Sequence, residues 1–316
     1  MTSDAAEDRS NMPVPMWGPV SREDVLEAFL QGRKETTLTA YRQDMADFAG
    51  FLGLTDREAV ETFLASGPGN ANLTALNYRS YLLTKGLQPT TINRRLATLR
   101  SLTKFARLAG WIVWKLELPG LKTQTYRDTS GPGSNAYRKM LSRVDLKTSR
   151  KATRDRAILR LLHDLGLRRG ELVALDMADA DLTTGTVQVL GKGRLQKERL
   201  SLPAPTLDAL KAWIDARGTE PGPLFLNCDR AGQGNGRLTG TAVYKLVRSL
   251  GQSVGVETRP HGLRHLGITE AVRAAQKAGY GIEEVLDFSR HADLKTLMVY
   301  VDRDRDTQGK IASLIA

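Results

Sequence analysis

Chemically capable side chains gather near the C-terminal end of this sequence. His261, Arg264 and His265 lie within five residues, in the stretch RPHGLRHLGITEAV. His291 follows and precedes Tyr300 by nine residues. Arginine forks match the negative charge that develops on a phosphodiester under attack. Histidine can hydrogen-bond a phosphate or move a proton near neutral pH, and a tyrosine hydroxyl can be a covalent nucleophile. These residue types therefore indicate phosphoryl transfer.

The composition favours a polyanionic partner. The chain has 316 residues, a formal net charge of +11 and a pI of about 9.8. An excess of this size suits nucleic acid, the commonest polyanion, and a merely basic protein without such a partner is the alternative.

Cysteine usage and hydropathy set further bounds. The single cysteine, Cys228, excludes an intrachain disulfide framework and a cysteine-rich zinc site. No apolar run approaches the roughly 20 residues that cross a bilayer. The N-terminus lacks the basic-then-apolar form of a signal peptide. We therefore expect a cytoplasmic protein with no membrane partner.

The elements that must position the reactive residues fall into two parts. Apolar residues at helical spacing over 21–110 predict a helical first half, in which Gly-Pro-Gly-Asn at 67–70 separates the third and fourth helices. The second half mixes helices with two strand-like runs at 187–190 and 199–203. The expected fold class is mainly α, with a small antiparallel β-sheet in the C-terminal domain. The predicted segments are a flexible N-terminal tail (1–20), a helical domain (21–118), a linker (119–134), a second domain (135–305) and a C-terminal tail helix (306–316).

The last helix of the first half, predicted over 88–110, carries a basic face. Acidic partners at i,i+4 are missing from this helix, which favours contacts with DNA phosphates over an ordinary solvated face. The candidate DNA-binding residues are Arg94, Arg95, Arg100, Lys104 and Arg107.

Four motifs follow one another in the second half: GLRRGEL, VLGKGRLQKERLSLP, HGLRH and SRHADLKTLMVY. Together they resemble the two arginine boxes, the β-hairpin box and the final tyrosine box of the tyrosine recombinases, the family of phage integrases and Xer-type site-specific recombinases. The resemblance covers residues 21–316. It implies six catalytic residues, which are Arg168, Lys192, His261, Arg264, His291 and the nucleophile Tyr300.

The resemblance implies an enzyme that cuts and rejoins DNA at a specific site through a 3′-phosphotyrosine, in integration, excision or resolution. It implies a two-domain clamp on double-stranded DNA, formed by a helical SAM-like core-binding domain and an α+β catalytic domain. A homo-tetramer would act on two sites, with the C-terminal tail in contact with a neighbouring subunit. No ATP, metal or other cofactor is implied. A type IB topoisomerase-like nicking-closing enzyme and a catalytically silent DNA-binding accessory protein are the alternatives.

Two neighbours of the implied residues carry alternatives. Lys197 competes with Lys192 for the role of catalytic lysine, because it has the more strand-like position. Glu171, three residues after Arg168, is either a carboxylate that braces this arginine or an ordinary helix-surface glutamate.

Two further positions depart from a simple pattern. His265 is expected to be structural and to point away from the face that His261 and Arg264 share, and His163 is expected to be a packed histidine. Arg290 stands where the family more often has glycine before the final histidine, and it either adds a phosphate contact or only changes the local turn.

Overall fold

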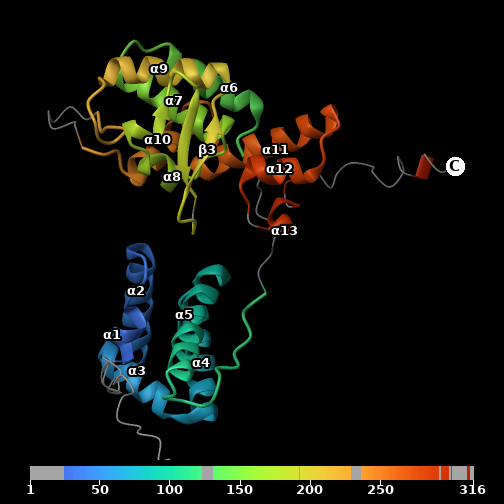
Figure 1. The fold of residues 1–316 in the computed structure, drawn as a ribbon. Helices are drawn as coiled ribbons and strands as arrows, with labels where there is room; N and C mark the ends of the chain where they lie inside the picture. The colour runs from blue at the N-terminus through green and yellow to red at the C-terminus, as the bar shows by residue number, and fades with distance from the viewer. Residues whose placement is uncertain are drawn as a thin grey trace, which may run out of the picture. The chain divides into compact units, whose positions relative to one another are not determined.

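The computed structural model describes residues 25–122, 131–191, 193–228, 236–291, 293–298, 300 and 312–313. The chain divides into two compact units, residues 1–125 and 126–316, each with its own hydrophobic core. Both units are mainly helical, and a small antiparallel sheet lies in the second (Figure 1). The predicted fold class is therefore confirmed. None of the helices in the described part of the chain combines the length and apolar character needed to cross a membrane.

The first unit packs its helices around aromatic side chains. Phe48 is fully buried, and its ring meets the rings of Phe63 and Tyr78 edge-on at 5.2 and 5.1 Å between centroids. The apolar stripe of the last helix is also fully buried, which matches its helical spacing. The helices are α1 (Val25–Leu30), α2 (Glu35–Leu52), α3 (Asp56–Ala65), α4 (Gly67–Thr84) and α5 (Pro89–Leu108).

The junction between α3 and α4 differs from the prediction. Gly-Pro-Gly-Asn forms the first turn of α4, so its expected role as a separating loop is wrong. Proline fits there because the first backbone N–H groups of a helix have no partner within it. Gly67 takes a left-handed φ of 77°, which lets α4 begin directly after the turn at Ser66.

The second unit is built around α7, which packs against α6, α9 and α11. Its apolar residues from Ala157 to Leu162 are buried in the main core of the unit. The helices are α6 (Ser134–Asp145), α7 (Arg150–Asp164), α8 (Arg169–Ala174), the 3-10 turn η2 (Met177–Asp179), α9 (Ala204–Arg217), α10 (Gly240–Ser253), α11 (Pro260–Ala278), α12 (Ile282–Ser289) and α13 (Leu294–Leu297).

The sheet of the second unit has the strand order β1-β2-β3, with both pairs antiparallel. β2 (Thr186–Leu190) and β3 (Lys197–Ser201) correspond to the two predicted runs, and Val187 and Val189 point into the core with the period of two that a strand requires. β1 (Ala180–Asp181) has two residues, too few for any alternation to reveal it in the sequence.

α11 and α7 approach each other closely at Gly267. A Cβ atom at this position would lie against the backbone carbonyl of His163, closer than van der Waals contact allows. The missing side chain therefore sets the distance between α7 and α11, and α11 carries HGLRH at its N-terminal end.

We expect Gly267→Ala to destabilise the protein by about 1–3 kcal/mol, because the two helix backbones must move apart to admit a methyl group. Urea unfolding measures the change. Gly170→Ala in α8 is the matched control, because no atom lies within 4 Å of a Cβ built there. Equal stability of the two variants would contradict the close approach.

Candidate active site

The turn between α7 and α8 presents Arg168. Gly166 takes a left-handed φ of 55°, and Arg168 occupies the N-cap position of α8 in an extended conformation. The backbone N–H of Arg168 donates to Oε2 of Glu171 at 2.9 Å, and its Nη1 donates to Oε1 at 2.7 Å. These two contacts hold the guanidinium in place. The Arg168 side chain is 31% exposed, so the guanidinium is also accessible to a substrate.

Glu171 is a buried carboxylate that accepts hydrogen bonds from Arg168, and it is not a helix-surface glutamate. Its side chain is 4% exposed, and its Oε2 also accepts a hydrogen bond from Nη2 of Arg290 at 3.0 Å. Burial raises the pKa of Glu171, but the Arg168 N–H and the two guanidinium charges outweigh this effect and leave the pKa below its usual value. The carboxylate is therefore ionised at neutral pH.

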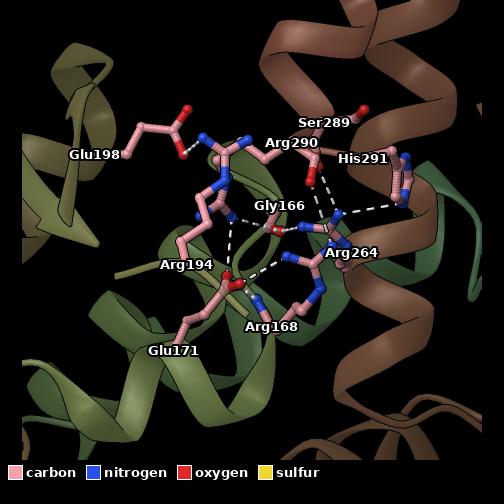
Figure 2. Close-up of polar contacts among 9 residues, drawn as sticks. All are labelled: Gly166, Arg168, Glu171, Arg194, Glu198, Arg264, Ser289, Arg290 and His291. Atoms are coloured by element: carbon pink, nitrogen blue, oxygen red, sulfur yellow. Dashed lines mark hydrogen bonds and ion pairs between the residues drawn. The ribbon is translucent and has the colours of Figure 1, made fainter. Parts of the chain in front are cut away.

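Arg264, in the first turns of α11, is the most deeply buried charge of the site. It is 1% exposed, and it donates from Nη1 to the carbonyl of Gly166 and from Nη2 to the carbonyl of Ser289 at 2.6 Å (Figure 2). Burial, with repulsion from Arg168 and Arg290, lowers the pKa of Arg264 to about 10. The guanidinium still carries its full charge at neutral pH.

His291 follows the end of α12 and contacts Arg264. The distance from Nη2 of Arg264 to Nε2 of His291 is 3.2 Å. Since a guanidinium only donates, Nε2 must accept, which places the proton of the neutral ring on Nδ1. Nδ1 is buried and has no hydrogen-bond partner among the described residues. Burial and the Arg264 charge lower the pKa of His291 to about 4, which keeps the ring neutral.

Arg290 is buried rather than directed at solvent. It adopts a left-handed φ of 54° at the C-cap of α12, the conformation that a glycine takes most easily. Its side chain is 2% exposed and reaches Glu171 and the carbonyl of Gly166. The two expectations for this position, an added phosphate contact or a changed turn, therefore miss its main feature, a buried ion pair.

Tyr300 lies in a small apolar cluster and is 6% exposed. Its ring stacks on His265 at 4.8 Å and on His291 at 5.5 Å between centroids. Burial raises the pKa of Tyr300, and the charges of Arg264 and Arg168 only partly oppose the rise. The hydroxyl is therefore protonated at neutral pH and must lose its proton during any attack.

His265 belongs to this constellation, and the expectation that it points away from it is wrong. Residues four apart in a helix share a face, as residues three apart do. The rings of His261 and His265 meet edge-on at 4.2 Å, and His265 covers Tyr300. Burial and the surrounding positive groups lower the pKa of His265 to about 3. His261 itself is exposed at the N-terminal end of α11.

His163 lies outside this constellation. Its ring stacks on Tyr137 at 4.0 Å, its Nδ1 contacts Asp164 at 2.6 Å and its Nε2 lies 3.0 Å from Glu270. It is a packed histidine, as its position in a helix suggested.

The implied general acid, Lys192, lies outside the described residues, as does most of the predicted tail helix (306–316) and all of the predicted N-terminal tail (1–20). The competing lysine, Lys197, forms an ion pair with the buried Asp179. Its ammonium group is therefore already engaged within the fold. In the part of the chain that the structure describes, no cluster of His, Cys, Asp or Glu side chains is placed to hold a metal ion.

Two of the candidate DNA-binding residues on α5 have acidic partners from α2. Arg94 contacts Asp44 at 2.5 Å, and Arg95 forms an ion pair with Asp47. Both acidic partners lie about 50 residues away in another helix, so the spacing of charges within α5 does not reveal them. Arg100 is half-buried, and its Nε donates to the carbonyl of Leu96. Lys104 and Arg107 are exposed.

We expect the stability of the protein to fall as the pH drops below about 6.5, partly because of His265. Its pKa is about 6.5 when unfolded and about 3 when folded, so between these values the unfolded chain binds more protons. His265→Gln removes this contribution. Between pH 7 and pH 5 the variant should lose less free energy of unfolding than the wild type, by up to about 2 kcal/mol. Identical losses in urea titrations would contradict the buried, neutral state of His265.

The sequence of this chain matches a known protein family and several of its members. The model of the phage integrase family matches residues 134–306. A tyrosine recombinase of Synechocystis sp. (slr0733) is 36% identical over 304 residues, covering 93% of this chain and 95% of the relative. A tyrosine recombinase of Synechococcus elongatus is 34% identical over 319 residues, covering 98% and 96%.

Solved structures share the fold. The structure of the XerH site-specific recombinase bound to palindromic difH substrate has a TM-score of 0.66 at 18% identity, covering 93% of this chain and 84% of that one. The topoisomerase and accessory-protein alternatives gain no support from these similarities. The sequence motifs and the cluster of arginines, histidines and tyrosine agree with these relatives. The chain therefore belongs to the phage integrase family and is a tyrosine recombinase, an enzyme of site-specific DNA recombination.

Proposed function

We propose that Tyr300 is the nucleophile with which this recombinase cuts DNA. Its hydroxyl oxygen attacks the scissile phosphorus, and the bond from phosphorus to the 5′-oxygen breaks, which leaves a 3′-phosphotyrosine. His261 assists removal of the tyrosyl proton, and Lys192 protonates the leaving 5′-oxygen. The 5′-hydroxyl of a partner strand then attacks the phosphotyrosine. One phosphodiester replaces another, so the exchange needs neither ATP nor a metal.

The observation that carries this proposal is the contiguity of Tyr300, His291 and Arg264. The Tyr300 ring stacks on His291, and His291 is hydrogen-bonded to Arg264 at 3.2 Å. A phosphate bound at the arginine cluster would therefore lie close to the tyrosine ring. Proximity between a nucleophile and the charges that bind its target favours a covalent attack on phosphorus.

The charges of the site support the same reaction. Arg168, Arg264 and Arg290 gather around one buried carboxylate, Glu171, so the cluster keeps an excess of positive charge. Negative charge grows on the non-bridging oxygens as the tyrosine attacks. Preorganised guanidinium groups stabilise that charge more strongly in the transition state than in the ground state.

DNA is the proposed substrate and partner. We infer that residues 21–118 form the core DNA-binding domain and residues 135–305 the catalytic domain, joined by a linker (119–134) and closing on the duplex as a clamp. Recombination between two sites calls for a homo-tetramer, and the tail (306–316) is the proposed contact with a neighbouring subunit. Double-stranded DNA as substrate agrees with the cytoplasmic location expected from the sequence.

Covalent trapping on nicked duplexes tiled across the DNA that flanks the gene tests the nucleophile. We expect a protein–DNA adduct on a denaturing gel that is lost in Tyr300→Phe. Tyr280→Phe is the matched control, because Tyr280 is 61% exposed and lies outside the cluster, and it should form the adduct normally. Relaxation of supercoiled plasmid without any specific site would instead indicate a nicking-closing enzyme.

The exposed cations of α5 should bind DNA phosphates. Lys104→Ala and Arg107→Ala are each expected to weaken binding about equally on all sequences and to lower the slope of log K against log salt by about 1. Arg95→Ala serves as the contrast, because Arg95 is engaged with Asp47 and its loss should act on stability rather than on that slope. Unchanged slopes for Lys104→Ala and Arg107→Ala would remove α5 from the DNA interface.

A further inference from the structure

We propose that Arg290 is a positioning residue for catalysis, which holds Glu171 and Arg168 in place from the backbone position directly before His291. The inference rests on the proposed function, because it concerns the rate at which Tyr300 attacks DNA. It is carried by the conformation, burial and contacts of this one residue, which stands where the family more often has glycine.

The backbone of Arg290 gives the first argument. Within the described ranges it is the only non-glycine residue with a positive φ, and the left-handed region is unfavourable for a residue that carries a Cβ atom. Its N–H donates to the carbonyls of Leu286 and Asp287, which closes α12. A glycine would close the helix without this cost. The arginine side chain must therefore contribute something that glycine cannot.

The side chain provides that contribution through two acceptors. Nη2 of Arg290 donates to Oε2 of Glu171 at 3.0 Å and to the carbonyl of Gly166 at 3.3 Å. The same carbonyl accepts from Arg264, so Arg290 and Arg264 share one anchor in the turn after α7 (Figure 2). Arg290 thus ties the end of α12 to the turn that presents Arg168.

The main chain of Arg290 contacts Arg168 directly. Its carbonyl accepts a hydrogen bond from Nη2 of Arg168 at 3.4 Å, while Nη1 of Arg168 is held by Glu171. The guanidinium of Arg168 is therefore fixed on one side by Glu171 and on the other by the residue that precedes His291. Arg290 therefore links Arg168 to His291, two residues expected to contact the same phosphate.

The charges give Arg290 a second effect. Glu171 carries one negative charge, and two guanidinium groups share it. Without Arg290, the carboxylate would neutralise Arg168 alone. With Arg290 present, more of the Arg168 charge is left for a phosphate. Arg290 therefore acts on the reaction through Arg168 and needs no contact with DNA.

Three substitutions separate this role from a purely backbone role. Arg290→Gly and Arg290→Asn both suit the left-handed conformation but remove the guanidinium, whereas Arg290→Lys keeps a positive charge and the backbone cost. We expect single-turnover cleavage by the Gly and Asn variants to be about 10- to 100-fold slower at saturating DNA, with unchanged affinity for DNA. The Lys variant should recover part of the rate. Cleavage by Arg290→Gly at the wild-type rate, with Arg290→Lys slower, would overturn the inference.

A double-mutant cycle with Glu171→Gln tests the same contact without any DNA. If Arg290 acts through Glu171, Arg290→Gly should shift the melting temperature differently in the wild-type and Glu171→Gln backgrounds. Additive shifts would overturn the inference. If wild-type protein forms no adduct on any flanking duplex, either its target lies elsewhere or it no longer cuts DNA, and the melting cycle alone still decides whether Arg290 acts through Glu171.

Discussion

The burial of the Arg264 guanidinium is the constraint on which the geometry of the candidate active site depends. A charge removed from water costs several kcal/mol unless well-placed partners compensate for it. Arg264 obtains its partners from the turn after α7, from the last residue of α12 and from His291. The two carbonyl acceptors lie 98 and 25 residues from Arg264 in the sequence. Their hydrogen bonds to this one side chain therefore hold both segments against α11. Any displacement of these segments would leave the charge without acceptors.

This arrangement stores positive charge that the folded protein does not neutralise. Arg168 and Arg290 repel Arg264, and together with its burial they lower its pKa. Like charges held together raise the free energy of the protein alone, and a phosphate placed among them lowers it. The site is thus arranged for an anion before the anion arrives. The same reasoning explains why Glu171 is buried among these groups, since without a carboxylate the cluster would be harder to fold.

The sequence predicted the features that depend on local pattern. The helical spacing of α5 and the strands β2 and β3 follow from spacing and residue type. It could not predict contacts that the tertiary fold creates. Asp44 and Asp47 meet α5 from positions about 50 residues away. The burial of Arg290 depends on Glu171, which lies 119 residues earlier. The one hint in the sequence was an arginine directly before His291, where the family more often has glycine.

The arginines of the site are charged at neutral pH, whereas His265 and His291 are neutral. Arginines keep their charge even when buried, because their ordinary pKa is so high, whereas the same surroundings hold His265 and His291 neutral. Neutral rings can stack on Tyr300 without adding to the repulsion around Arg264. A neutral His291 also retains one N–H that Arg264 does not use. Burial, together with the positive charges of the arginines, therefore keeps His291 neutral, so the ring adds no further cation to the cluster.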